Sequence, residues 1–189
     1  MNAPGLERRA VLRLAGTALA GAALGRAFPL GAALAAGRID ARLAELGVEL
    51  PAAAAPVANY VGWVRTGNLV FVAGQGPILD GEVKYKGRVG ADLTIEQGQA
   101  AARLCALNVL AQLKAACDGD LDRVVRCVKV GGFVNSAPDF FDQPKVVNGA
   151  SDLFVEVFGD AGRHARFAVG TSVLPFNIAV EVDAHFEVS

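Results

Sequence analysis

The sequence contains few of the residues from which metal sites and disulfide frameworks are built. Its 189 residues include only three cysteines and two histidines. Cys105, Cys117 and Cys127 lack the paired C-x-x-C spacing of zinc sites, and the histidines form no H-x-x-x-H pair. We therefore expect no metal site and thiols that are buried by default. At most one disulfide can form, and the sequence does not identify its members.

The sequence also lacks the motifs of two common enzyme classes. There is no G-x-S-x-G motif, and no serine has a histidine close to it in sequence, which argues against a serine triad (Ser136, Ser151, Ser172, Ser189). His164 and His185 are interpreted as surface or strand-face histidines. Gly74-Gln75-Gly76 follows a predicted strand, but Pro77 and Leu79 stand where a dinucleotide loop needs glycine and a helix start.

No apolar run is long enough for a typical membrane span, which takes about 20 residues. Arg8-Arg9 and Arg13 precede an Ala/Gly-rich run over residues 14–24, and Ala33-Leu34-Ala35 offers small residues for cleavage. We interpret residues 1–35 as a twin-arginine signal peptide that directs the protein to the periplasm. The alternatives are an uncleaved leader on a cytoplasmic protein and, third, a membrane anchor. A stable membrane anchor is not expected.

Excess positive charge is absent from the rest of the chain. Residues 1–35 contain four arginines and one glutamate, so their removal leaves 14 basic and 18 acidic residues, a net charge of −4. Non-specific nucleic-acid binding depends on clustered Lys and Arg, so we expect no nucleic-acid partner. The densest basic patch, Lys84 to Arg88, is typical of a solvated hairpin rim.

Patterns over residues 36–56 predict a short helix, Ile39 to Leu46, and an Ala/Pro linker over residues 51–56. One domain is expected over residues 57–189. Its first hairpin spans residues 63–65 and 68–73, and a third strand lies around residues 83–85 after an Asp-Gly turn. Thr94 and Gln97 form a capping-box pattern at the start of a helix that ends near Gly119.

The second half of the chain predicts a strand, a helix and two further strands. The Val-rich strand 124–134 contains Gly131-Gly132, which indicates a bulge or a close backbone approach. A helix follows over residues 144–158. Residues 165–174 and 178–188 are interpreted as one hairpin with a turn at 175–177, so that Arg166 and Glu181 face one small space. A guanidinium there would hold a carboxylate and the acid would activate water.

The last strand alternates strictly, with Glu181, Asp183, His185 and Glu187 on one face and apolar residues on the other. Glu181 is therefore also compatible with a solvated carboxylate that has no special role. The predicted fold class is α+β, a mixed β-sheet with two helices on one face.

The stretch from Leu43 to Val188 resembles the Rid (YjgF) family, and more specifically its branch named “putative endoribonuclease, chorismate-mutase-like”. The resemblance rests on a set of short segments taken together: 43–47, 59–60, 67–75, 90–94, 147–150, 164–166, 174–175 and 180–182. It implies a chorismate-mutase-like (Rid) fold and a homotrimer with clefts between its subunits. The activity that the resemblance implies requires no cofactor.

In this family the arginine of the penultimate strand pairs with a substrate carboxylate, and a glutamate on the last strand positions the hydrolytic water. The resemblance assigns these catalytic roles to Arg166 and Glu181. Tyr60 and Asn148 would line the cleft, with the backbone of Gly74 and Gln75 at its border. Two departures stand out. Ala168 replaces a cysteine and Ala73 replaces a serine that the family's deaminases commonly carry.

The expected function is hydrolysis of reactive enamine or imine intermediates to 2-oxo acids and ammonia. Whether the protein is an enzyme is left open by the two departures. The alternative is a non-catalytic trimeric protein that binds a small carboxylate on Arg166. An endoribonuclease or a pericyclic enzyme ranks third, because only the names of relatives favour it.

Overall fold

The computed structural model describes residues 37–56 and 58–189. The signal peptide expected over residues 1–35 lies outside the described residues, so export stays a prediction. In the described part of the chain, no helix has both the length and the apolar character that crossing a membrane requires.

A five-stranded sheet forms the centre of the domain, in the order β1-β2-β7-β5-β6. The strands are β1 (Trp63–Thr66), β2 (Leu69–Gln75), β5 (Val124–Asn135), β6 (Ala165–Thr171) and β7 (Val180–Val188). Strands β5 and β6 run parallel, whereas the other three neighbouring pairs are antiparallel. The predicted mixed sheet is confirmed.

The predicted hairpin between residues 165–174 and 178–188 is wrong. Strand β5 lies between β6 and β7 and pairs with both of them. The cause is the long helix between β5 and β6, which carries the chain back so that β6 joins the far edge of β5 in parallel. The chain then passes a 3₁₀ turn, Pro175–Asn177, and enters β7 on the other side of β5.

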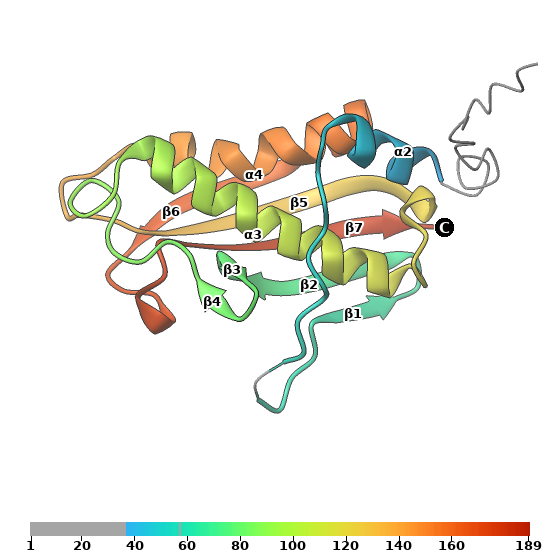
Figure 1. The fold of residues 1–189 in the computed structure, drawn as a ribbon, viewed down its shortest axis with the longest axis horizontal. Helices are drawn as coiled ribbons and strands as arrows, with labels where there is room; N and C mark the ends of the chain where they lie inside the picture. The colour runs from blue at the N-terminus through green and yellow to red at the C-terminus, as the bar shows by residue number, and fades with distance from the viewer. Residues whose placement is uncertain (1–36, 57) are drawn as a thin grey trace, which may run out of the picture.

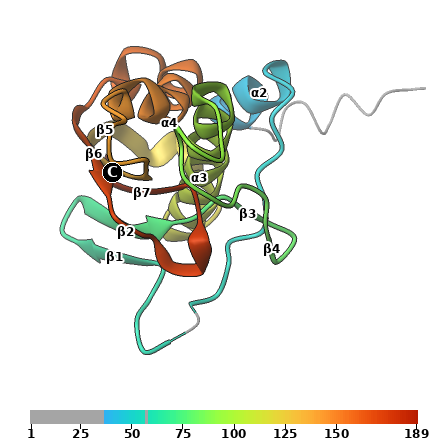
Figure 2. The same ribbon diagram turned by 90° about the vertical axis from the view of Figure 1, so that its left-hand side faces the viewer.

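Two long helices cover one face of the sheet, as predicted (Figures 1 and 2). They are α3 (Ile95–Ala116) and α4 (Gln143–Phe158), and they pack against each other. The capping box of α3 is confirmed, because Thr94 Oγ1 accepts from the Gln97 amide and the Gln97 side chain accepts from the Thr94 amide. The predicted short helix is α2 (Arg38–Glu45), which contacts α4.

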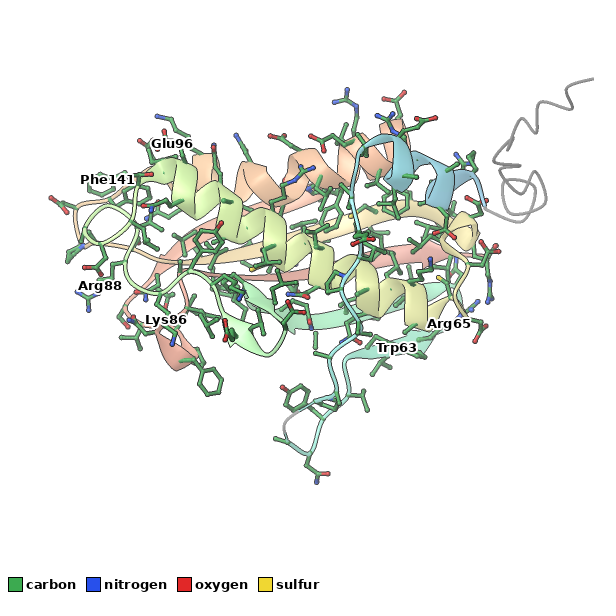
Figure 3. The ribbon with its side chains drawn as sticks, viewed as in Figure 1. Trp63, Arg65, Lys86, Arg88, Glu96 and Phe141 are labelled. Atoms are coloured by element: carbon green, nitrogen blue, oxygen red, sulfur yellow. The ribbon has the colours of Figure 1, made fainter. Side chains whose placement is uncertain are left out.

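The third predicted strand does not join the main sheet. Instead β3 (Ile78–Leu79) and β4 (Glu82–Val83) form a separate two-stranded hairpin. Asp80 and Gly81 have positive φ at its turn. The basic patch follows this hairpin. Lys84 forms an ion pair of 2.7 Å with Glu82, and Lys86 and Arg88 lie at the end of the molecule opposite Arg65 (Figure 3).

The core lies between the sheet and the helices. The apolar residues of β7 are buried there, and the polar row from Glu181 to Glu187 faces away, which confirms the predicted alternation. Gly131 and Gly132 mark a close approach. A Cβ at Gly131 would overlap Phe167 and Asp183, and one at Gly132 would overlap Val147. The bulges of β5 lie before these glycines, between Val124 and Lys129.

The three cysteines are free and buried. Burial raises the pKa of the Cys127 thiol to about 12 and that of Cys105 well above its usual range. These thiols therefore stay protonated and unreactive at neutral pH.

The other face of the sheet, which we call the open face, is covered by no element of the described chain. Its apolar side chains are partly exposed, among them Val64, Phe71, Phe133 and Val169, and charged residues of β7 lie between them. An uncovered sheet face with this much apolar surface is typical of an interface between protein chains.

Candidate active site

Glu181 lies on the open face at the start of β7, beside a cavity of about 230 Å³. Four predicted site residues line this cavity: Tyr60, Gly74, Gln75 and Glu181. Gly74 is packed directly beneath the carboxylate, because a Cβ at that position would overlap Glu181 Oε1. The local sequence therefore needs a glycine there so that the carboxylate can lie against the backbone of β2.

Two causes raise the pKa of the Glu181 carboxyl. Burial is the larger, and the negative charge of Asp183 two residues along the strand adds to it. Both disfavour the ionised form. A carboxyl with a raised pKa holds a proton more readily than an ordinary glutamate, so it is better suited to exchanging protons with water or substrate.

The remaining walls of the cavity are mostly apolar. They come from the extended segment over residues 51–56, from Ile78, and from Phe176 and Ile178 before β7. Phe176 and Asn177 both have positive φ, an uncommon conformation for residues other than glycine. This turn leaves the Phe176 ring 73% exposed at the cavity.

Two buried amides of α3 fix these walls, and the sequence analysis missed both. Gln112 Nε2 donates to the Ala54 carbonyl at 2.7 Å, and Asn108 Nδ2 donates to the carbonyls of Gly76 and Ile78 at 3.0 and 2.8 Å. Their spacing of four residues in the otherwise apolar stretch over residues 104–113 was the available signal, since it places both amides on one helix face.

Arg166 lies at the edge of the sheet on strand β6, on the side of the helices. Its register partner on β5 is the buried Val130. The guanidinium is held by neutral acceptors of α4: Nη1 donates to Asn148 Oδ1 at 2.9 Å and to Ser151 Oγ at 3.0 Å, and Nη2 donates to the Pro144 carbonyl at 3.3 Å. No carboxylate of the described residues lies within 4.0 Å of it.

These three bonds use three of the five N–H groups of the guanidinium. Two remain, one on Nε and one on Nη2, without a partner in the described part of the chain. Arg166 is therefore oriented, exposed and able to bind a carboxylate.

The structure does not bring Arg166 and Glu181 to one place within a single chain. Glu181 faces away from the helices and Arg166 lies on their side, with β5 between the two strands. The predicted site is thus divided into two half-sites. One contains Tyr60, Gly74, Gln75 and Glu181, and the other contains Arg166 and Asn148.

Ser151 and His164 form a contact that the sequence analysis did not anticipate. Ser151 Oγ and His164 Nε2 are 3.0 Å apart, beside Arg166. The two residues are thirteen positions apart, and α4 and the turn after it bring them together. No local motif signals this pair.

The two departures from the family pattern lie in different surroundings. Ala168 packs against the core beneath α4, and Ala73 is half-buried in β2 next to Gly74. Neither position supplies a polar side chain. Over the described residues, no three His, Cys, Asp or Glu side chains gather in a way that would hold a metal ion.

A family model described as “YjgF/chorismate mutase-like, putative endoribonuclease” matches residues 40–187. Protein TCP17 of Trypanosoma cruzi is 55% identical over 157 residues, which are 82% of this chain and 98% of that protein.

Two solved structures are also similar. A protein of unknown function from Agrobacterium tumefaciens is 50% identical, with a TM-score of 0.75 over 80% of this chain and 92% of that one. A protein named “putative endoribonuclease” from Shewanella oneidensis is 39% identical, with a TM-score of 0.77 over 80% of this chain and all of that one.

Proposed function

Because this chain belongs to the YjgF/chorismate-mutase-like family, we propose that it hydrolyses reactive enamine or imine intermediates to 2-oxo acids and ammonia. The reaction takes place in clefts between the subunits of a homotrimer. Each cleft combines the Glu181 half-site of one subunit with the Arg166 half-site of the next.

One observation carries this proposal. The two half-sites lie on opposite sides of one sheet, and each has part of what the reaction requires. The Glu181 half-site has an acid and a cavity but no cation among its lining residues. The Arg166 half-site has a cation with two N–H groups to spare and no carboxylate partner among the described residues. The open face supplies apolar surface through which subunits would associate.

In this cleft the guanidinium of Arg166 anchors the substrate carboxylate. Imines hydrolyse readily in water, so the protein contributes mainly position and proton transfer. Glu181 takes a proton from the attacking water and returns it to the leaving amine, and the raised pKa of its carboxyl favours both transfers over those of an ordinary glutamate. Tyr60 and Gln75 shape the cavity beside it.

Binding without catalysis is the second candidate, and the surroundings of Ala168 and Ala73 favour it. Ala168 packs its methyl group against the core and Ala73 is half-buried beside Gly74, so neither position offers a thiol or a hydroxyl for the reaction. The Arg166 anchor would then hold a small carboxylate that is not turned over.

Mixing two inactive variants tests the cleft between subunits. Arg166→Ala and Glu181→Gln should each lose the release of ammonia from 2-iminopropionate generated in place. After the two proteins are unfolded together and refolded, random assembly should restore about a quarter of the clefts, because a cleft can take Arg166 from one variant and Glu181 from the other.

Light scattering on the full chain should report a trimer. A monodisperse monomer, or an active wild type whose mixed variants stay inactive, would contradict the shared cleft. If the wild type binds 2-oxo acids but releases ammonia no faster than buffer does, the binding function is correct instead.

A further inference from the structure

The hydrogen bonds of His164 fix which of its nitrogens is a base. Its Nδ1 lies 2.6 Å from the Gly162 carbonyl, and a carbonyl only accepts, so Nδ1 carries the proton of the neutral ring. Nε2 is then an acceptor, and the Ser151 hydroxyl donates to it across 3.0 Å. The rings of Phe154 and His164 meet edge to face, with centroids 6.0 Å apart. This is the arrangement of a nucleophile, its base and a group that orients the base.

Arg166 completes the cluster. Its Nη1 donates to the same Ser151 oxygen at 3.0 Å, so a fixed positive charge lies beside the hydroxyl. Burial lowers the pKa of His164, the hydrogen bond to the Gly162 carbonyl partly opposes this, and the charge of Arg166 lowers the pKa further. The imidazole therefore favours its neutral form, which is the form that can act as a base. The whole cluster is partly exposed to solvent, so a small molecule can approach the hydroxyl.

We propose that Ser151, His164 and Arg166 form a second reactive centre, which hydrolyses small esters whose acyl group carries a free carboxylate. The Ser151–His164 chemistry is independent of the proposed imine hydrolysis, whereas the carboxylate preference rests on the Arg166 anchor used there.

The reaction has two balanced steps. Ser151 Oγ bonds to the ester carbonyl carbon, and its proton passes to His164 Nε2. The bond from this carbon to the alcohol oxygen then breaks, and the proton on Nε2 goes to the departing alcohol. In the second step water attacks the acyl-serine, His164 takes the proton of that water, and Ser151 recovers it as the acid leaves. No cofactor or oxidant enters.

Arg166 has two roles in this centre. The N–H groups on Nε and Nη2 that have no partner in the described part of the chain bind the free carboxylate of the acyl group. The bond from Nη1 holds the hydroxyl and favours negative charge on its oxygen. The expected substrate is therefore a half-ester of a short dicarboxylic acid.

A labelling experiment identifies the nucleophile without any variant. The full-length protein is treated with a fluorophosphonate, which phosphonylates activated serines, and its peptides are analysed by mass spectrometry. The adduct is expected on Ser151. Its rate of formation should rise with pH and level off at a pH below the ordinary histidine range, because the pKa of His164 is lowered. An unlabelled Ser151 overturns the proposal.

Ester hydrolysis tests the mechanism and the substrate class. Mono-4-nitrophenyl glutarate should be hydrolysed faster than 4-nitrophenyl butyrate, by about tenfold or more, because one charge-assisted ion pair is worth at least that. Ser151→Ala should remove the activity, and His164→Gln should lower it by about 100-fold or more. Ser172→Ala, a matched change on an exposed serine after β6, should change nothing.

The result also separates this centre from the proposed imine hydrolysis. Glu181→Gln should stop ammonia release and leave ester hydrolysis intact. Ester hydrolysis that Glu181→Gln abolishes, or that Ser151→Ala leaves unchanged, overturns the proposal. Equal rates for the two esters overturn the carboxylate preference, and with it the Arg166 anchor.

Discussion

The Glu181 and Arg166 half-sites show two opposite ways of holding a charged group. Glu181 is half-buried between β2 and a mostly apolar cavity, where its charge is disfavoured. Arg166 is exposed, yet its guanidinium is held in position by a carbonyl, an amide oxygen and a hydroxyl. The first environment changes the chemistry of the group it holds. The second keeps a full charge available and only orients it.

For the proposed reaction, this difference gives each region a separate role. A buried guanidinium would be neutralised by a carboxylate partner, and an exposed glutamate would titrate as in a free peptide. Placing the two on opposite faces of one sheet keeps them apart within a chain. Only association of chains would bring the modified acid and the oriented cation together.

The largest expected effect is that of a substitution at Glu181 on the rate of ammonia release. Glu181→Gln should lower the release of ammonia from 2-iminopropionate by about 100-fold or more, because the amide keeps the shape but takes no proton from water. The binding of a 2-oxo acid such as pyruvate should stay within about threefold, since the proposed contact with its carboxylate is made by Arg166 and not by Glu181. Glu187→Gln is the matched control on the same strand face, because its charge does not act on the pKa of Glu181. An equal loss in both variants would indicate damage to the open face instead of lost proton transfer.

Arg166→Ala should have the next largest effect, and on binding. Loss of charge-assisted hydrogen bonds should weaken pyruvate binding by about 10- to 200-fold, as measured by calorimetry. The melting temperature should change little, because the partners of Arg166 are neutral groups at the surface.

Arg163→Ala provides the comparison for this change. It removes an exposed arginine three residues earlier, whose ion pair is with Asp160. Its binding of pyruvate should equal that of the wild type. If Arg166→Ala instead unfolds the protein while the wild type binds no carboxylate, the arginine is structural and both proposed functions fail.

How much of this could be predicted from sequence depended on whether the signal was local. The capping box of Thr94 and Gln97 and the alternation of β7 involve neighbouring residues, and both predictions are confirmed. The hairpin of β6 and β7 was wrong because strand pairing depends on where α4 returns the chain, which the residues of the two strands do not encode.

The residues of the candidate sites also divide into those that the sequence could indicate and those that depend on distant parts of the chain. Tyr60, Gly74, Gln75 and Glu181 were named together on a family resemblance, and the structure gathers them at one cavity. Gln112 and the Ser151–His164 pair were missed because each acts on a residue that is distant in sequence. A single amide in an apolar helix, or a serine thirteen residues before a histidine, is not informative until the chain is folded.

Gln112→Leu should give a smaller effect, a change in KM, that tests whether the wall of the Glu181 cavity helps to hold the substrate. The Ala54 carbonyl would lose its donor, and Ala54 is exposed, so the cost is that of an ordinary hydrogen bond, about 0.5 to 1.5 kcal/mol. The segment over residues 51–56 would then lie less firmly over the cavity. We expect KM for the imine to rise several-fold with a smaller change in kcat.

Gln99→Leu is the matched control for Gln112→Leu. Gln99 also joins α3 to a backbone carbonyl, that of Lys145 at 2.9 Å, but it does not line the Glu181 cavity. Its kinetics should match the wild type. A KM that rises equally in both variants would mean that general loosening of α3, and not the wall of the cavity, is responsible.

The smallest effect concerns the pH dependence of the free energy of unfolding, which only the Glu181 half-site should change. The pKa of Glu181 is raised in the folded protein, so the native state binds its proton more tightly than the unfolded chain does. Its contribution to the free energy of unfolding therefore falls as pH rises from the ordinary glutamate value through the raised one. This fall in the free energy of unfolding is absent from Glu181→Gln, which should be more stable than the wild type at pH 7 and no more stable at pH 4.

Arg166→Ala should show no such pH-dependent difference from the wild type, because a guanidinium stays charged throughout this range. Urea unfolding of the three proteins at both pH values measures this. The wild type could instead gain stability relative to Glu181→Gln between pH 4 and pH 7. The Glu181 carboxylate would then have a favourable partner in the folded protein. Its pKa would be lowered and not raised, which contradicts the proposed role of a half-buried acid.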